Sequence, residues 1–372
     1  MQTQTAEQPV VAVPAGISAL RLSGARLHLP FFYLVTIYLM LAIMTLDYSV
    51  GDFLSSLAVS LVFGTPMLLL AVFVMRFVWL ASTTRPERPL KVLLQDIWRL
   101  STCPERSSLG WPSIVLLLSL MTIFGTFKSA VPSFGGFTWD ATFAEWDRIL
   151  HFGRHPWEWL QPVLGYPPIT FAINLVYNFW MLSMWMVFCA WAFMTRSSVE
   201  RTRFLLAFML VWSIGGSLLA ILLASAGPCF YSRIGLSPDP YAGLMAYLQS
   251  ANEVLPIWAL DAQNILWQGF NGTTVLDGIT AMPSMHNASA LLFFLASRQL
   301  GKWPRRLLGA QVVIVYLGSI HLGWHYAIDA YVAWAVTLAC WFVSKPLAEM
   351  WERHHPATSH NAMAEAFVQT PR

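Results

Sequence analysis

The sequence predicts an all-helical integral membrane protein with about eight transmembrane helices. Of its 372 residues, 56% are hydrophobic and only 11% are charged, whereas an ordinary soluble domain carries about 25% charged residues. The apolar residues also gather in runs close to the length of about 20 residues that a helix needs to cross the hydrocarbon core of a bilayer. This composition excludes a soluble enzyme, a disordered chain and a fibrous protein.

Eight apolar segments account for the predicted helices. The sixth and seventh are short, but a polar turn at residues 297–306 (SRQLGKWPRR) separates them. In chain order, the predicted segments are residues 29–48, 57–80, 112–127, 168–194, 204–226, 285–300, 307–320 and 326–343. The first 28 residues contain no compact apolar run followed by a cleavage site, so no removed signal peptide is expected.

The helices divide the chain into five parts. These are an N-terminal tail at residues 1–28, two additional helices at 29–80, a linker at 81–111, a six-helix core at 112–346 and a C-terminal tail at 347–372. In the linker, residues 88–100 (RPLKVLLQDIWRL) place apolar side chains at helical spacing beside three basic ones. This pattern favours an amphipathic helix at the membrane interface, and a solvated linker is the alternative.

The basic residues predict the orientation, because cytoplasmic loops of membrane proteins are enriched in Lys and Arg. With the N-terminus inside, 18 of the 22 basic residues fall in inner segments, and the outer segments keep only Lys128, Arg148, Arg154 and Arg233. Both termini and the linker are therefore expected in the cytoplasm. Two long segments, residues 129–167 and 227–283, are expected outside, and long structured loops often carry function.

Several other kinds of site are not supported by the sequence. The net charge of +3 is too small to favour nucleic-acid binding, and no basic run alternates with aromatic residues. The four cysteines lie far apart without a CxxC spacing, which argues against a zinc site or a disulfide framework; they are Cys103, Cys189, Cys229 and Cys340. A solvated tail is expected for His354, His355 and His360. No metal and no cofactor are implied.

Two clusters of polar and titratable residues do indicate a site, because ionisable groups at membrane depth are costly. The first is PSMHN at residues 283–287, where Ser284 can cap a helix and His286 lies beside the free N–H groups of its first turn. The second is HLGWHYAID at residues 321–329, where His325 and Asp329 share one helical face. Two antiparallel helices join the clusters and return both to the same membrane face.

The two clusters together predict phosphoryl transfer through a phosphohistidine. A carboxylate that accepts the proton of one imidazole nitrogen leaves the other nitrogen as a nucleophile, and a helix N-terminus is suited to bind an anion. A single histidine at a helix end is more often a hydrogen-bonded structural residue. His321 keeps that structural interpretation, with no partner assigned to it.

The motifs PSMH (283–286) and GWHYAID (323–329) resemble the second and third signatures of the type 2 phosphatidic acid phosphatase superfamily. Within it, the chain looks most similar to the phosphotransferase branch that includes fungal inositol phosphorylceramide synthase and is akin to sphingomyelin synthases. The resemblance covers residues 112–343. It implies that His325 is the nucleophile and Asp329 orients it. It also implies that His286 is the general acid and that Ser284 helps to bind phosphate.

The chain departs from the phosphatase pattern in two places. It has no lysine–arginine–proline first motif, and Ser319 stands where the third motif usually carries an arginine. Because a phosphoryl group needs cationic help in the transition state, the outer basic residues are the candidates. Lys128 (in FKSAVP) and Arg233 (in GPCFYSR) are the best placed, with Tyr231 as a hydrogen-bond donor, and interfacial anchoring is the alternative for both cations. Arg148 and Arg154 are weaker candidates.

The sequence therefore predicts an enzyme with its site on the extracytoplasmic (periplasmic or lumenal) face. It would move a phosphorylated, inositol-phosphate-like head group from a membrane phospholipid donor to a lipid alcohol acceptor. A phosphatase acting on a lipid phosphate or a polyprenyl diphosphate would use the same residues. Two further alternatives are a transporter, which would place ionisable residues in broken helices near mid-membrane, and a non-catalytic lipid-binding scaffold.

Overall fold

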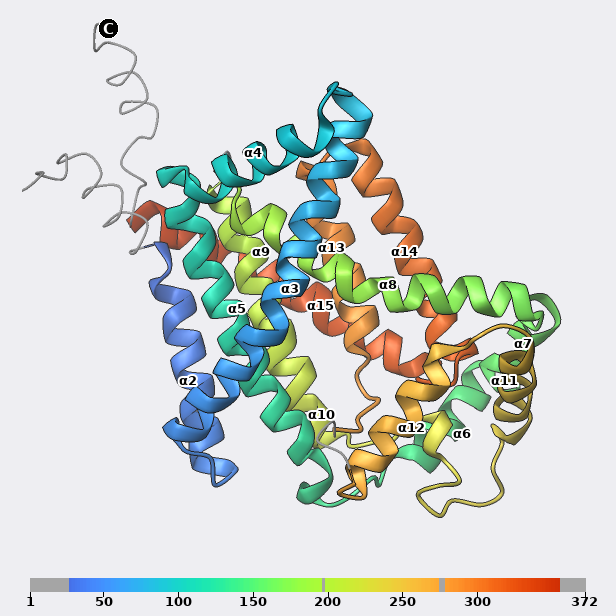
Figure 1. Cartoon of the computed structure of the whole chain (residues 1–372). Coiled ribbons are helices and arrows are strands. Elements are labelled where there is room, and N and C mark those ends of the chain that lie inside the picture. Colours follow the sequence, from blue (N-terminus) through green and yellow to red (C-terminus); the bar gives the residue numbers. More distant parts are fainter. Residues whose placement is uncertain (1–26, 196–197, 274–277, 355–372) are drawn as a thin grey trace, which may run out of the picture.

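The computed structural model describes residues 27–195, 198–273 and 278–354 (Figure 1). Within these ranges the chain is all-helical, as predicted, and no β-strand is present. Most of the predicted N-terminal tail and of the predicted C-terminal tail, including His355 and His360, lies outside the described residues.

Every one of the eight predicted segments contains a helix. The first five are α2 (Leu29–Thr45), α3 (Val50–Thr83), α5 (Pro104–Ala130), α8 (Pro167–Ala192) and α9 (Ser198–Leu210), the last of which continues through the wide π-helical turn η2 (Val211–Leu219) into α10 (Ala220–Leu222). The last three are α13 (Met285–Ala296), α14 (Lys302–His321) and α15 (Ala327–His354). The positions of the apolar runs therefore predicted the positions of the helices.

Five of these helical segments are long and apolar enough to cross a membrane, which makes the chain an integral membrane protein. They are Val50–Thr83, Arg106–Phe134, Pro167–Ala192, Val199–Leu222 and Ala327–His354. Helix α13 has 12 residues, or about 18 Å at 1.5 Å per residue, which is shorter than the hydrocarbon core. The count of eight spans stays a prediction.

Local sequence features begin and pack these helices. Ser49 and Asp52 form a capping box at the start of α3, in which each side chain accepts a hydrogen bond from the other residue's backbone N–H. In η2, a β-carbon at Gly216 would lie 2.7 Å from the ring of Phe124 and 3.5 Å from the sulfur of Met285. Glycine therefore leaves room for the Phe124 ring where η2 packs against α5.

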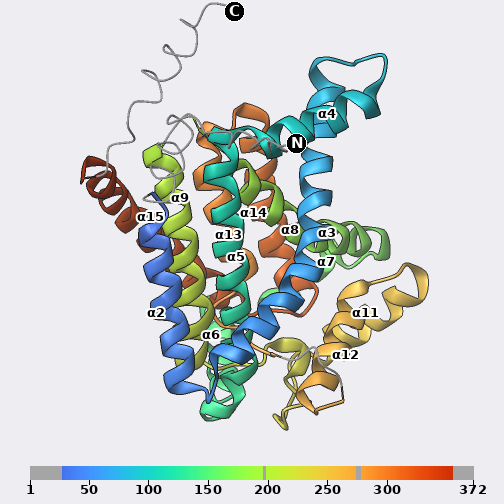
Figure 2. The same cartoon turned by 60° about the vertical axis from the view of Figure 1, so that its left-hand side comes forward.

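The predicted amphipathic segment is a helix, α4 (Pro89–Thr102). Leu93 is buried, whereas Leu90, Leu94 and Trp98 form an exposed apolar stripe with the four-residue spacing of one helical face. An ion pair between Arg76 and Asp96 joins α4 to α3. The helix crosses one end of the bundle (Figures 1 and 2), and its place at a membrane interface remains a prediction.

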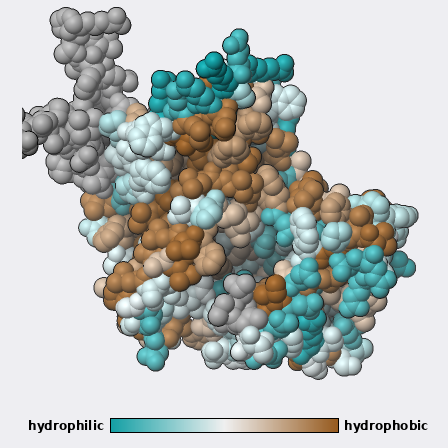
Figure 3. Space-filling model, in the orientation of Figure 1, coloured by the Kyte–Doolittle hydropathy of each residue, from teal (hydrophilic) through white to brown (hydrophobic). Residues whose placement is uncertain are grey.

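The two long segments predicted outside the membrane are largely helical. They contain α6 (Asp140–Leu150), α7 (Pro156–Leu164), α11 (Ala242–Val254) and α12 (Trp258–Phe270). Helices α6, α11 and α12 lie at the end of the molecule opposite α4 (Figures 1 and 2). Figure 3 shows hydrophilic surface at these two ends and a hydrophobic band between them. This arrangement is typical of a protein whose two ends face water.

Candidate active site

The first motif begins helix α13 as its sequence predicted. Ser284 is the N-cap residue, and its hydroxyl accepts a hydrogen bond from the backbone N–H of Asn287 at 3.4 Å. His286 lies in the first turn and is partly exposed. Ser284 itself is fully buried, and its backbone N–H donates to the backbone oxygen of Asp329 at 3.2 Å. The start of α13 is thus bonded directly to the second motif.

The second motif forms the turn between α14 and α15, and it brings His325 and Asp329 into contact. Nδ1 of His325 lies 3.1 Å from Oδ2 of Asp329, which also accepts the backbone N–H of Tyr326 at 3.1 Å. Asp329 is fully buried and His325 is 7% exposed. Because the carboxylate holds Nδ1, Nε2 is the imidazole nitrogen left for chemistry. The imidazole of His325 also forms a hydrogen bond with the backbone of Ala281.

The two histidines face each other across the site. Their ring centroids are 6.1 Å apart, with an interplanar angle of 58°. Two aromatic residues of α8 fix the ring of His286: Tyr177 stacks on it at 4.7 Å and Trp180 packs at 4.1 Å. Trp180 is itself held by a 2.7 Å hydrogen bond from Nε1 to the hydroxyl of Ser289. The position of the His286 ring is therefore set by its packing against α8.

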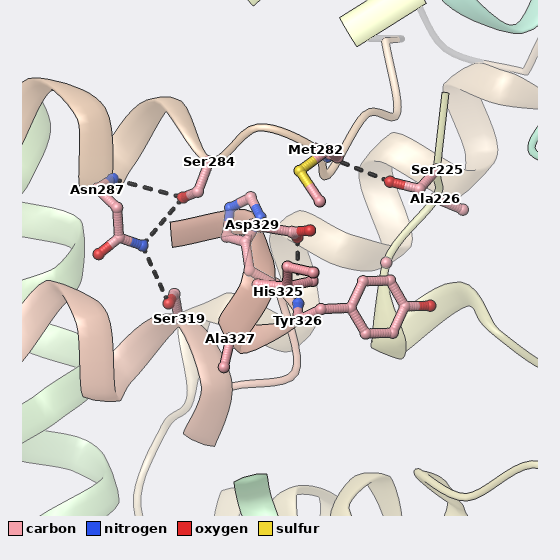
Figure 4. Close-up of polar contacts among 12 residues, drawn as sticks. Ser225, Ala226, Met282, Ser284, Asn287, Ser319, His325, Tyr326, Ala327 and Asp329 are labelled. Carbon is pink, nitrogen blue, oxygen red and sulfur yellow. Dashed lines mark hydrogen bonds and ion pairs between the residues drawn. The ribbon is translucent and has the colours of Figure 1, made fainter. Parts of the chain in front are cut away.

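A chain of neutral hydrogen bonds sets the register of α13 against α14 (Figure 4). The side-chain amide of Asn287 donates to Ser284 Oγ at 3.1 Å and to Ser319 Oγ at 3.2 Å. Ser319 in turn donates to the backbone oxygen of Tyr316 at 2.8 Å, and its own backbone oxygen accepts the N–H of His325 at 3.0 Å. The position that carries an arginine in the phosphatase pattern thus holds a buried, hydrogen-bonded hydroxyl.

Two buried carboxylates of α6 hold the loops of the site, and sequence reasoning did not assign them. Asp140 accepts the backbone N–H groups of Ala226 and Gly227, each at 2.8 Å, and the hydroxyl of Tyr326 at 2.7 Å. Burial raises the pKa of the Asp140 carboxyl above its usual value, against the opposing effect of these donors. Tyr326, the residue after His325, is therefore hydrogen-bonded to helix α6.

Asp147, two turns further along α6, caps helix α15. Its carboxylate accepts the backbone N–H groups of Ala327 at 2.7 Å and Ile328 at 3.0 Å, which are orphan donors at the first turn of a helix. Burial, the largest effect, raises the pKa of Asp147 to about 7. No pattern in a single sequence marks this contact, since the partners are separated by about half of the chain.

The structure separates the two cations singled out in the sequence. The charge of Lys128, at the end of α5, acts on both His286 and His325, and its side chain packs beside Gly278. Arg233 is exposed and donates a 2.9 Å hydrogen bond to Asn264. Tyr231 is buried in a cluster with Met282 and Tyr326.

The other histidine and arginines have structural contacts. His321 is fully buried, and its Nε2 lies 2.9 Å from the hydroxyl of Thr170, in agreement with the structural interpretation. Arg148 forms an exposed ion pair with Glu145 at 2.7 Å, and Arg154 packs over the ring of Trp159. Within the described ranges, no group of three or more His, Cys, Asp or Glu side chains is arranged to hold a metal ion.

Comparison with known proteins gives one match. Residues 141–343, more than half of the chain, match the family described as the PAP2 superfamily. The matched region begins within α6 and includes both motifs, helices α13 and α14, and most of α15. No curated protein and no solved structure matches the chain.

Proposed function

The chain belongs to the PAP2 superfamily, and from this membership we propose that it is a membrane-embedded lipid phosphotransferase. In this proposal it moves a phosphorylated head group from a phospholipid to the hydroxyl of a lipid alcohol. One observation carries most of the weight: His286 and His325 face each other at 6.1 Å, with the buried carboxylate of Asp329 on Nδ1 of His325. Reacting atoms meet at about 3–3.5 Å, so rings at this centroid separation are close enough for one phosphoryl group to contact both.

In the first half-reaction, Nε2 of His325 attacks the phosphorus of the donor lipid. A nitrogen–phosphorus bond forms, the bond from phosphorus to the leaving lipid oxygen breaks, and His286 gives its proton to that oxygen. Asp329 holds the Nδ1 proton of His325 and stabilises the positive charge that develops on the imidazole, as the aspartate of a catalytic triad does. The products are a lipid alcohol and a phosphohistidine that carries the head group.

In the second half-reaction, the hydroxyl oxygen of the acceptor lipid attacks the same phosphorus. Its proton returns to His286, the nitrogen–phosphorus bond breaks, and His325 regains its free nitrogen. Water in place of the acceptor completes a hydrolysis with the same residues. Lys128 supplies positive charge for the phosphoryl oxygens in both steps, and Ser284 fixes the start of α13. The geometry favours Lys128 over Arg233 for this role, because Arg233 is exposed and bonded to Asn264.

The site is assigned to the extracytoplasmic face. It lies at the end of the bundle that carries α6, α11 and α12, opposite α4 (Figures 1 and 2). In the distribution of basic residues, this is the end that keeps only 4 of the 22. The six-helix unit at residues 112–346 is the catalytic core in this proposal, with α2 and α3 as additions to it.

The decisive experiment supplies purified protein with labelled phospholipids of different head groups, with and without candidate lipid alcohols. Mass spectrometry of the products is expected to detect head-group transfer that requires both lipids. Release of free phosphate or head group without an acceptor would make the protein a phosphatase. A His325→Gln variant is expected to form neither product nor an acid-labile, alkali-stable phosphoenzyme, and full activity of that variant would refute the mechanism.

A further inference from the structure

Tyr177 stacks on His286, and its buried hydroxyl has no use in the mechanism above. Tyr177 is 3% exposed, and its hydroxyl has no hydrogen-bond partner among the residues that the structure describes. A buried hydroxyl left unpaired costs about 1–3 kcal/mol. A hydrogen-bonding group that enters the site, such as a phosphoryl oxygen, would remove this cost.

The packing of Tyr177 fixes its ring and hence the position of the hydroxyl. One face of the ring stacks on His286 at 4.7 Å with an interplanar angle of 16°. Against α14, Gly318 is so close that a β-carbon there would lie 3.2 Å from the ring, and Leu322 of the turn before His325 belongs to the same buried cluster. A tyrosine held on several sides cannot turn its hydroxyl away at a low cost.

The electrostatic surroundings of Tyr177 include Cys229 and Asp329. Its phenol interacts with the charge of Asp329, the residue that orients His325. Its neighbour on α8, Trp180, has already used its N–H group on Ser289. Ser319 carries no charge and donates to Tyr316. Of these three side chains, Tyr177 is the one whose donor group the described contacts leave unused.

We propose that Tyr177 is a further catalytic residue, whose hydroxyl donates a hydrogen bond to a non-bridging phosphoryl oxygen while phosphorus moves between the leaving oxygen and His325. The proposal rests on the proposed function. Negative charge increases on these oxygens as the nucleophile approaches, so a fixed donor stabilises the transition state more than the bound substrate. Tyr177 and Lys128 would then share the task that an arginine performs in the phosphatase pattern.

The test compares Tyr177→Phe with Tyr48→Phe. Tyr48 also has a buried hydroxyl without a partner among the described residues, but it lies in the turn between α2 and α3, before the region that matches the family. Both substitutions remove one hydroxyl and keep the ring. We expect Tyr177→Phe to lower kcat by about 10²–10³-fold, the effect of losing one transition-state donor, with little change in KM. The control is expected to keep the wild-type kcat.

Two further measurements separate a catalytic role from a structural one. Removing an unpaired buried hydroxyl should leave the melting temperature of Tyr177→Phe equal to the wild-type value or above it. Vanadate, which mimics five-coordinate phosphorus, should raise the melting temperature of the wild type and of Tyr48→Phe but much less that of Tyr177→Phe. A wild-type kcat in Tyr177→Phe, or a melting temperature well below that of the control variant, would overturn the proposal.

The same set of proteins distinguishes this inference from the proposed function. If His325→Gln is inactive and Tyr177→Phe is fully active, only the role of Tyr177 fails. If His325→Gln is as active as the wild type, the phosphohistidine mechanism fails, and the role of Tyr177 fails with it.

Discussion

Replacing Lys128 by methionine is the sharpest test of how the site manages phosphate charge. Methionine keeps an unbranched side chain that is one atom shorter and removes the ammonium group, whose charge acts on both His286 and His325. Arg233→Met is the matched control, because it removes one positive charge from the same predicted face. Arg233 is exposed and bonded to Asn264, so the two variants differ in their relation to the histidines.

The expected magnitudes follow from burial. His325 is 7% exposed, so a charge that acts on it is only weakly screened by water. Loss of one such transition-state interaction costs about 10²–10³-fold in kcat, or about 2.7–4 kcal/mol. An exposed side chain away from the site changes free energies by about 0.5 kcal/mol or less, so Arg233→Met should alter kcat by about twofold at most.

The assay is steady-state turnover of the donor lipid identified for the wild type, with melting temperatures to confirm folding. Lys128→Arg should recover part of the lost activity, since it restores the charge with a different shape. The inhibition constant of vanadate should rise in Lys128→Met in parallel with the loss of kcat. Equal losses in the two methionine variants, or wild-type turnover in a folded Lys128→Met protein, would refute the assignment of Lys128 to the phosphate.

Three other expectations concern stability, pH and orientation. Asn287→Ala removes the hydrogen bonds to Ser284 and Ser319, so the free energy of unfolding should fall by about 1–3 kcal/mol at roughly 0.5–1.5 per bond; an unchanged melting curve would contradict this. Burial raises the pKa of Asp147 from 3.8 to about 7, so folding takes up a proton between these values. The difference in melting temperature between the wild type and Asp147→Asn should therefore fall as pH rises from about 4 to 7, and it should stay constant above about pH 7. A difference that rises over this pH range would contradict the raised pKa of Asp147. Single cysteines at Ser101 and Ser237 should react with an impermeant reagent from opposite sides of the membrane, and labelling of both in intact cells would overturn the predicted orientation.

The helices were predictable because their cause is local. A run of apolar residues at residues 57–80 or 168–194 needs no distant partner to favour a helix in a membrane, and α3 and α8 lie where these runs are. The short sixth and seventh segments were the hardest to interpret, and α13 and α14 remain outside the set that meets the length and hydropathy of a span. The packing of α13 and α14 against other helices of the bundle compensates for their short length or low hydropathy.

The site was predictable where its residues belong to the two motifs, which the antiparallel helices between them bring together. The four-residue spacing of His325 and Asp329 implied their contact, and it is present at 3.1 Å. The approach of Tyr177 to His286 and the contacts of Asp140 and Asp147 depend on how distant segments pack. A tyrosine or an aspartate in such a segment carries no periodic pattern that names its partner. The choice between Arg233 and Lys128 as phosphate ligands also depends on packing, because the sequence showed only that both are among the four basic residues of the outer segments.

The contact between Asp147 and α15 has a consequence for biosynthesis. The carboxylate meets Ala327 180 residues later in the chain, which at a synthesis rate of about 5–20 residues per second takes roughly 10 to 40 s. During that interval α6 is complete, but Asp140 and Asp147 lack the donors that the end of the chain supplies. Insertion of α15 then brings three groups into place together: the backbone N–H groups of Ala327 and Ile328, the hydroxyl of Tyr326 and the carboxylate of Asp329. A nascent or truncated chain without this helix therefore leaves the Asp147 carboxylate without its backbone donors, whereas Asp140 keeps the N–H groups of Ala226 and Gly227.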